Sequence, residues 1–171
     1  MTLWLKTCGS TQDELLALAL NGGARLFDAV AAETQTKGRG SLGRSCESPE
    51  GGLYMSVLLP FSEDLTVSAA KAVRESINRT LGILCDYKPL NDLYYRGKKV
   101  CGVLAQAVPS LDNAPKLAVC GIGIDLFEPD EPFNCETAGS LLGPEASQEK
   151  RAALTALLAD NIVEDLRIAF G

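Results

Sequence analysis

Apolar residues recur along the chain at two spacings, one typical of helices and the other of strands. Helical spacing predicts a helix over Leu65–Leu81 and another over Glu149–Phe170. The apolar positions are Leu65, Ala69, Val73, Ile77 and Leu81 in the first, and Leu154, Leu158, Ile162, Leu166 and Ala169 in the second. A further helix is predicted to start at Ser10 and Thr11, where Thr11 and Glu14 have the spacing of a capping box, and to stop at Asn21-Gly22-Gly23.

Short apolar runs bounded by turn residues predict the strands. They are Leu3–Leu5, Phe27–Ala32, Leu53–Leu59, Ile83–Lys88, Leu93–Tyr95, Lys99–Val108 and Lys116–Asp125. Arg96-Gly97 joins two of them in a hairpin, and Phe127–Pro144 is predicted to be mostly loop because it is rich in proline, glycine and acids. Helices and strands do not alternate regularly. The pattern therefore predicts an α+β fold with a mixed, mainly antiparallel sheet and packed helices.

Length and composition narrow the function. The 171 residues fit one domain, and the net charge of −6 argues against a nucleic-acid partner bound through a basic face. No apolar segment is long enough to span a membrane and the first residues lack an export signal, so we expect a cytoplasmic protein with reduced cysteines and no membrane partner. The chain has no histidine, which excludes histidine triads and histidine metal sites. Catalysis must then use Lys, Arg, Asp, Glu, the backbone or a bound metal ion.

Three polar stretches lie outside the predicted helices. The stretch Ala31–Arg44 places three glycines among three cations after a strand, which suits a phosphate or another compact anion, although a solvated basic turn has the same composition. The stretch 88–92, with Gly97-Lys98-Lys99, gathers cations and a carboxylate at a hairpin that could equally be a solvated lysine rim. Glycines in the apolar strand 120–125 allow close approach of a ligand or of a neighbouring side chain.

Taken together these stretches resemble the catalytic domain of biotin protein ligases. That family has a Ser-Thr-Asn helix start, an A-E-x-Q-x-x-G-R-G-R-x-G-R loop, a K-W-P-N-D-L segment, a G-x-K-x-A-G-I-L-x-E hairpin and a G-x-G-I-N strand. The matching segments here are Ser10-Thr11-Gln12, Ala32–Arg44, Lys88–Leu93, Gly97–Gln106 and Gly121–Asp125, in the same order. Residues 48–54 also resemble the family's segment after the loop.

The resemblance implies a class II aminoacyl-tRNA synthetase-like fold and a two-step reaction. Biotin would react with ATP, accompanied by Mg²⁺, to give biotinyl-adenylate, and a lysine of a biotin carboxyl carrier protein or domain would then accept the biotin. The implied catalytic residues are Lys99, Asp92, Arg39 and Lys88. The implied substrate- and ATP-binding residues are Ser10, Thr11, Gln12, Gln35, Gly38, Arg39, Gly40, Arg44, Asn91, Lys99, Gly102 and Asp125, with no residues assigned to a metal.

Within these motifs the chain departs from the family at five positions. Ser41 stands in place of an arginine, Pro89-Leu90 in place of Trp-Pro, Gln106 in place of a glutamate and Asp125 in place of an asparagine. We expect residues 1–171 to form a single catalytic domain, without the DNA-binding domain or the small C-terminal β domain of some relatives. A lipoate or other acyl-carrier ligase of the same fold, and a non-catalytic module that binds biotin or a nucleotide, are the alternatives.

Overall fold

The computed structural model describes residues 1–89, 91–144 and 147–171, with only the backbone at Ser41. Leu90, one of the departures from the family motif, lies outside the described residues. The elements are β1 (Thr2–Cys8), α1 (Thr11–Leu20), β2 (Ala29–Gln35), the short 3₁₀ turn η1 (Ser41–Gly43), β3 (Leu53–Pro60), α2 (Leu65–Leu81), β4 (Asp86–Lys88), β5 (Asp92–Tyr95), β6 (Lys98–Ala107), β7 (Leu117–Ile124) and α3 (Gln148–Phe170).

The strands form a single sheet in the order β1-β2-β3-β7-β6-β5-β4. Strand β1 runs parallel to β2, and the pairings β2–β3, β3–β7, β7–β6, β6–β5 and β5–β4 are antiparallel. The predicted α+β fold with a mixed, mainly antiparallel sheet is therefore confirmed.

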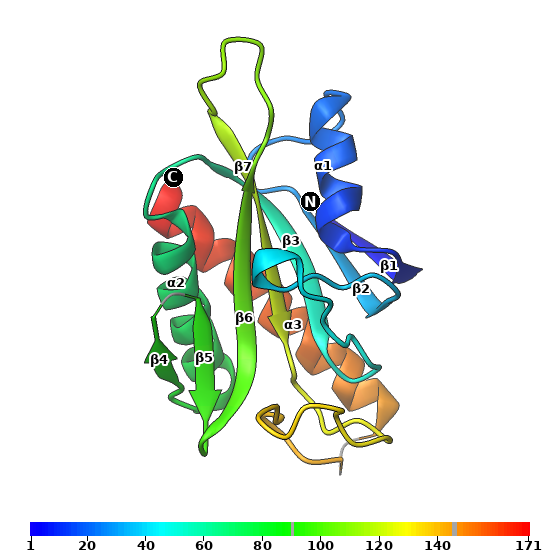
Figure 1. Ribbon diagram of the computed structural model, residues 1–171. Coiled ribbons are helices and arrows are strands. Elements are labelled where there is room, and N and C mark those ends of the chain that lie inside the picture. The colour runs from blue at the N-terminus through cyan, green and yellow to red at the C-terminus, as the bar shows by residue number, and fades with distance from the viewer. Residues whose placement is uncertain (90, 145–146) are drawn as a thin grey trace.

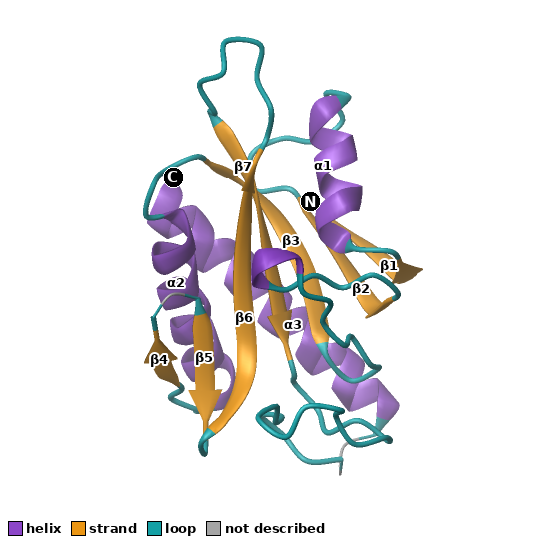
Figure 2. Ribbon diagram, viewed as in Figure 1, coloured by secondary structure: helices purple, strands orange, loops and turns teal. Residues whose placement is uncertain are grey.

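Helices α2 and α3 cover one face of the sheet, and α1 lies on the other (Figures 1 and 2). The alternation of side chains along β3 explains this division. Met55 and Val57 belong to the large core that includes residues of α2 and α3. Leu58 joins a smaller cluster with Leu15 of α1. The sheet is thus buried on one face by a two-helix layer and left open on part of the other.

Most predicted elements are present, with shifted ends. The bounds of α2 are confirmed, and the left-handed conformation of Gly82 (φ 69°) ends that helix. Strand β2 begins at Ala29, two residues later than predicted, because Phe27 has a positive φ of 67° and lies in a turn. Strand β4 keeps only Asp86–Lys88 of the predicted Ile83–Lys88.

The predicted capping box at Thr11 and Glu14 is wrong by one position. Ser10 is the N-cap of α1, and its hydroxyl accepts a hydrogen bond from the backbone N–H of Gln12 at 3.3 Å. Thr11 is already helical, so its hydroxyl is available elsewhere and lies 2.9 Å from the hydroxyl of Ser56 on β3. Because Ser10 and not Thr11 is the N-cap, the Thr11 hydroxyl can contact β3 and hold the start of α1 against the centre of the sheet.

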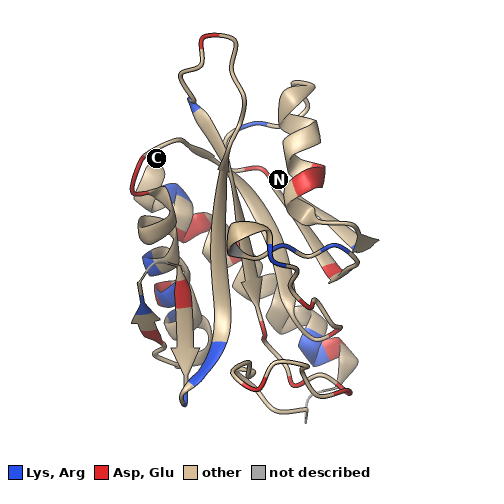
Figure 3. Ribbon diagram, in the orientation of Figure 1, with Lys and Arg blue, Asp and Glu red and all other residues tan. Residues whose placement is uncertain are grey.

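Charged residues are distributed unevenly around the open face. Figure 3 shows basic positions on the loop after β2 and at the β5–β6 turn, and acidic positions along the loop between β7 and α3. The β5–β6 turn is tight because Arg96 (φ 51°) and Gly97 (φ 77°) both have positive φ, as type I′ hairpins require. Within the described residues, no helix is long and apolar enough to cross a membrane.

Candidate active site

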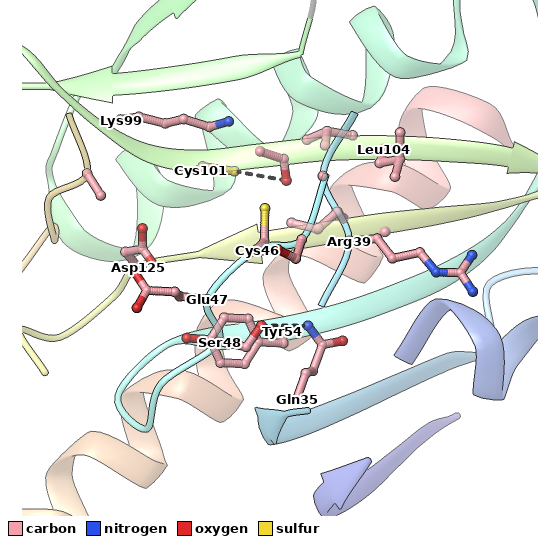
Figure 4. A pocket seen from close by; sticks show the side chains of 18 of the residues that line it. Gln35, Arg39, Cys46, Glu47, Ser48, Tyr54, Lys99, Cys101, Leu104 and Asp125 are labelled. Carbon is pink, nitrogen blue, oxygen red and sulfur yellow. Dashed lines mark hydrogen bonds between the residues drawn. The ribbon is translucent and has the colours of Figure 1, made fainter. Parts of the chain in front are cut away.

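A cleft of about 440 Å³ opens on the sheet face that carries α1. Its floor is formed by β3, β6 and β7, and its walls by the start of α1, the loop of residues 36–52 (the glycine loop) and part of the β7–α3 loop (residues 125–144) (Figure 4). Most of the predicted site residues line it: Ser10, Thr11, Gln12, Gln35, Arg39, Gly40, Asn91, Asp92, Lys99, Gly102 and Asp125. Motifs more than a hundred residues apart in sequence therefore meet in one cavity.

One end of the cleft is polar and uncharged. The side-chain oxygen of Gln35 accepts a hydrogen bond from the backbone N–H of Thr11 at 2.9 Å, and its amide nitrogen donates to the Ser48 hydroxyl at 3.0 Å. The amide nitrogen of Gln12 donates to the carbonyl oxygen of Leu104 at 3.4 Å. Because these groups are fixed by one another, this end is preorganised for a neutral polar ligand group.

Two glycines of the cleft floor, Gly121 and Gly102, leave space that a Cβ atom would restrict. At Gly121 a Cβ atom would lie 2.8 Å from the Gln12 side-chain oxygen, so this glycine admits a neighbouring side chain, as the plainer interpretation of the 120–125 strand predicted. At Gly102 the nearest atoms to a Cβ would be those of Lys99 and Asp92, at 3.6 to 3.8 Å. The missing side chain of Gly102 leaves space beside that pair.

Gly38 holds the glycine loop against the segment that follows it. A Cβ there would lie 2.5 Å from the Ser48 hydroxyl oxygen and 2.6 Å from the carbonyl oxygen of Cys46. The Cys46 N–H also donates to the Gly38 carbonyl at 2.9 Å. Gly38 is buried and does not line the cleft, so the structure gives it a packing position beneath the loop.

Arg39 belongs to the cleft wall, but its guanidinium points away from Lys99 toward α1 (Figure 4). It forms an ion pair with Asp13, and both side chains are exposed. An exposed ion pair is worth roughly 0–1 kcal/mol, so a bound anion can compete for this arginine.

Lys99 and Asp92 form an ion pair at the cleft wall. The Lys99 Nζ atom lies 3.0 Å from Asp92 Oδ1, on the paired strands β6 and β5. Burial lowers the pKa of Lys99, but its hydrogen bond and charge interaction with Asp92 outweigh burial and hold this pKa above its ordinary value. Lys99 is therefore positively charged at neutral pH and 40 % exposed, which leaves its amine accessible to a ligand.

The opposite end of the cleft is acidic. Asp125 and Glu47 lie beside one another there (Figure 4). Burial raises the pKa of Asp125 to about 7, with the positive charge of Lys99 opposing the rise and Glu47 adding to it. Asp125 thus exchanges its proton near neutral pH, where its protonated form offers a hydrogen-bond donor as well as an acceptor.

At this acidic end, residues 134–139 of the β7–α3 loop link the glycine loop to β6. The Glu47 carboxylate accepts hydrogen bonds from the backbone N–H of Asn134 at 3.0 Å and from its side-chain amide at 2.5 Å. On the other side, the Lys99 N–H donates to the Thr137 carbonyl at 2.8 Å, and the Gly139 N–H donates to the Lys99 carbonyl at 3.0 Å. The segment therefore spans the cleft from the glycine loop to β6.

Three predicted site residues lie away from the cleft lining. Lys88 is exposed on the edge strand β4, with its amine 4.0 Å from the ring centre of Tyr94. Arg44 is exposed, and its carbonyl accepts a hydrogen bond from the Gly40 N–H at 2.6 Å. Gly38 is the third. The roles predicted for these residues remain predictions.

Other lining residues were not among the predicted site residues, although some of them lie in segments that match the family's motifs. They are Ser45, Cys46, Glu47, Ser48, Tyr54, Met55, Ser56, Cys101, Val103, Leu104, Gly121, Ile122, Gly123, Phe133, Asn134, Cys135, Thr137 and Ala138. A signal existed for Tyr54 and Ser56, which alternate with apolar residues on β3 and so share one face. Tyr54 is held in place by a 2.6 Å hydrogen bond to the Pro49 carbonyl, and burial raises its pKa. No local pattern marks residues 133–138, because their position depends on distant contacts.

The described residues do not form a metal cage. No group of three or more Asp, Glu or Cys side chains converges among them in a way that could hold a metal ion. The Asp92 carboxylate is already paired with Lys99.

Comparison with known proteins agrees with this geometry. The model of the biotin/lipoate A/B protein ligase family matches residues 27–125. The curated bifunctional ligase/repressor BirA proteins of Bacillus spizizenii and Bacillus subtilis are each 36% identical over an alignment of 131 residues, and the match covers 72% of this chain and 40% of theirs. This chain thus spans well under half the length of those two relatives.

Solved structures share the fold. The biotin protein ligase from Aquifex aeolicus in complex with biotin and ATP has a TM-score of 0.76 and 30% identity, and the match covers 97% of this chain and 70% of that one. The biotin acetyl coenzyme A carboxylase synthetase from Helicobacter pylori with bound biotinylated ATP has a TM-score of 0.72 and covers 99% of this chain and 74% of that one, but at 20% identity it supports only the fold. The family model spans more than half of the residues, including the glycine loop, the hairpin and β7, and the resemblance found in the sequence is confirmed: this chain belongs to the biotin/lipoate A/B protein ligase family.

Proposed function

We propose that this protein is a biotin protein ligase that uses ATP to form biotinyl-adenylate and transfers the biotin to a lysine of a carrier protein or domain. The observation that carries the proposal is the Lys99–Asp92 ion pair in a cleft with one neutral polar end and a glycine loop along its wall. Biotin has an uncharged ureido ring and a carboxylate tail, which match the polar end and the cation. The 30% identity to the biotin protein ligase from Aquifex aeolicus, whose structure is in complex with biotin and ATP, supports the same substrate.

In the first step, a carboxylate oxygen of biotin would attack the α-phosphorus of ATP and pyrophosphate would leave. Negative charge accumulates on the reacting oxygens, and the fixed positive charge of Lys99 stabilises it. Arg39 would leave Asp13 and turn to the phosphate groups, because its exposed ion pair is weak. Mg²⁺ would accompany the ATP substrate as a counter-ion of its phosphate oxygens.

In the second step, the amine of the carrier lysine would attack the biotin carbonyl, with AMP as the leaving group. Asp92 lies at the cleft wall beside Lys99 and would orient the incoming amine through a hydrogen bond. Neither step requires an imidazole base, in agreement with a sequence that has no histidine. Because the reaction consumes ATP, we place it in the cytoplasm.

Calorimetry tests the proposal directly. We expect biotin to bind, its affinity to increase with ATP and Mg²⁺, and lipoate to bind weakly or not at all. Biotin-dependent ATP–pyrophosphate exchange then reports the first step, and mass analysis of a carrier domain reports the second. Binding of lipoate in place of biotin would instead assign the other activity of the family, and biotin binding without exchange would indicate a non-catalytic module.

A further inference from the structure

Two of the six cysteines are exposed, and both line the cleft. Cys46 lies on the glycine loop and Cys135 on the β7–α3 loop. Cys85, Cys101 and Cys120 are buried, and all six thiols are free. The proposed ligase chemistry uses neither Cys46 nor Cys135.

The loops that carry these two cysteines are already joined at the neighbouring residues. Glu47 follows Cys46, Asn134 precedes Cys135, and the two hydrogen bonds of 3.0 and 2.5 Å between Glu47 and Asn134 hold the loops together. Neither segment belongs to a helix or strand of the sheet. A disulfide needs Cα atoms about 4.4–6.8 Å apart. A bridge between Cys46 and Cys135 would add a covalent link beside these hydrogen bonds at the acidic end of the cleft.

The two thiols are suited to different steps of disulfide formation. The Thr137 hydroxyl lies 3.0 Å from the Cys135 sulfur, and hydrogen bonds from Thr137 lower the pKa of this thiol. Burial raises the pKa of Cys46, although the charge of Lys99 opposes the rise. Cys135 is therefore the better thiolate nucleophile, and Cys46 is the thiol that acts second.

We propose that Cys46 and Cys135 form a reversible disulfide that closes the Asp125 end of the cleft, with a small-molecule disulfide such as oxidised glutathione as the oxidant. The Cys135 thiolate attacks one sulfur of the oxidant and releases one small thiol. The Cys46 thiol then loses its proton and attacks the Cys135 sulfur of the mixed disulfide, releasing a second small thiol. Two protein thiols are oxidised, and one small disulfide is reduced to two thiols.

The consequence for ligand binding rests on the proposed function. Asp125 is one of the residues that the resemblance to biotin ligases implies for substrate or ATP binding, and residues 134–139 already span this end of the cleft. A covalent link would fix the glycine loop to that segment and so restrict the entry of a nucleotide at this end. At the neutral end, the hydrogen bonds of Gln35 with the Thr11 N–H and of Gln12 with the Leu104 carbonyl do not involve the glycine loop and would remain.

The test starts with the full chain and oxidised glutathione. Peptide mapping should show a peptide joined between Cys46 and Cys135, with the mass lowered by two hydrogen atoms and restored by dithiothreitol. Calorimetry on the same samples should show ATP affinity about ten-fold or more weaker in the oxidised protein, and biotin affinity less affected.

Three variants serve as controls. Cys46→Ser should stop at a mixed disulfide on Cys135, seen as one added glutathione, and Cys135→Ser should give no cross-link. Cys8→Ser, on β1 and outside the cleft, should cross-link as the parent does. Absence of a joined peptide containing Cys46 and Cys135 in the oxidised parent overturns the proposal. Failure of the reduced protein to bind biotin or ATP would refute the proposed function instead, and mapping would still decide the disulfide.

Discussion

Replacement of Lys99 by alanine is the most direct test of the proposed chemistry. Two unit charges 4 Å apart interact by about 4 kcal/mol at an effective dielectric constant near 20. Lys99 is 40 % exposed, so solvent screening reduces its interaction with the reacting oxygens, and we expect a loss of about 3 kcal/mol. This loss corresponds to a rate of adenylate formation lower by a factor on the order of 10². The fold should persist, because the backbone of Lys99 would still pair with Thr137 and Gly139.

Biotin-dependent ATP–pyrophosphate exchange measures the loss, and circular dichroism checks the fold. Lys98→Ala is a matched control, since this neighbouring amine donates to the Glu136 carbonyl and does not line the cleft. Lys98→Ala should retain exchange within a few-fold of the parent. An exchange rate in Lys99→Ala close to that of the parent would refute the electrostatic role of this residue.

Four further substitutions test other parts of the site. Asp92→Ala should leave adenylation largely intact and slow transfer from preformed adenylate to the carrier lysine; equal single-turnover transfer rates in variant and parent would rule out its orienting role. Ser41→Arg should slow the release of biotinyl-adenylate by about one to two decades, because one charge-assisted contact is worth roughly 1.5–3 kcal/mol. Labelling of a bystander protein measures this release. The side chain of Ser41 lies outside the described residues. Asp125→Asn should raise the thermal midpoint at pH 8 by about 3–6 °C, for roughly 1–2 kcal/mol, and less at pH 5. The sign follows from a folded pKa of about 7 against 3.8 for the free side chain, so the parent loses stability as pH rises between these values; a pH-independent difference would contradict the buried carboxylate. Gly38→Ala should displace the glycine loop and weaken ATP binding, whereas Gly9→Ala, where a Cβ meets nothing within 4 Å, should not; unchanged ATP affinity in Gly38→Ala would show that the loop tolerates the contact.

Local sequence was sufficient for the elements whose signals are short-range. Helix α2 has apolar residues at helical spacing along its whole length and a glycine at its end, so both bounds follow from the sequence. The β5–β6 hairpin follows in the same way from Arg96-Gly97. Most of the residues that the motifs predicted for the site also line the cleft.

Contacts between distant residues explain what the sequence could not show. The 134–139 segment has no periodic pattern, and its place at the cleft depends on Glu47, 87 residues away from Asn134. The outward direction of Arg39 depends on Asp13 of α1, to which no motif connects it. The distance of Lys88 from the cleft follows from its place on the edge strand β4, which only the sheet order reveals.

The division of the sheet into two faces has a consequence for how this protein can change. Along β3, side chains alternate between the face packed against α2 and α3 and the opposite face, which holds the cleft, so neighbouring positions are under different constraints. Val57 and Leu59 lie in the helix-packed core, whereas Tyr54 and Ser56 border the ligand space. Substitutions of the second kind can alter substrate preference while the two-helix layer maintains the fold. Evolution or design can therefore vary specificity and thermal resistance as nearly separate properties of one sheet.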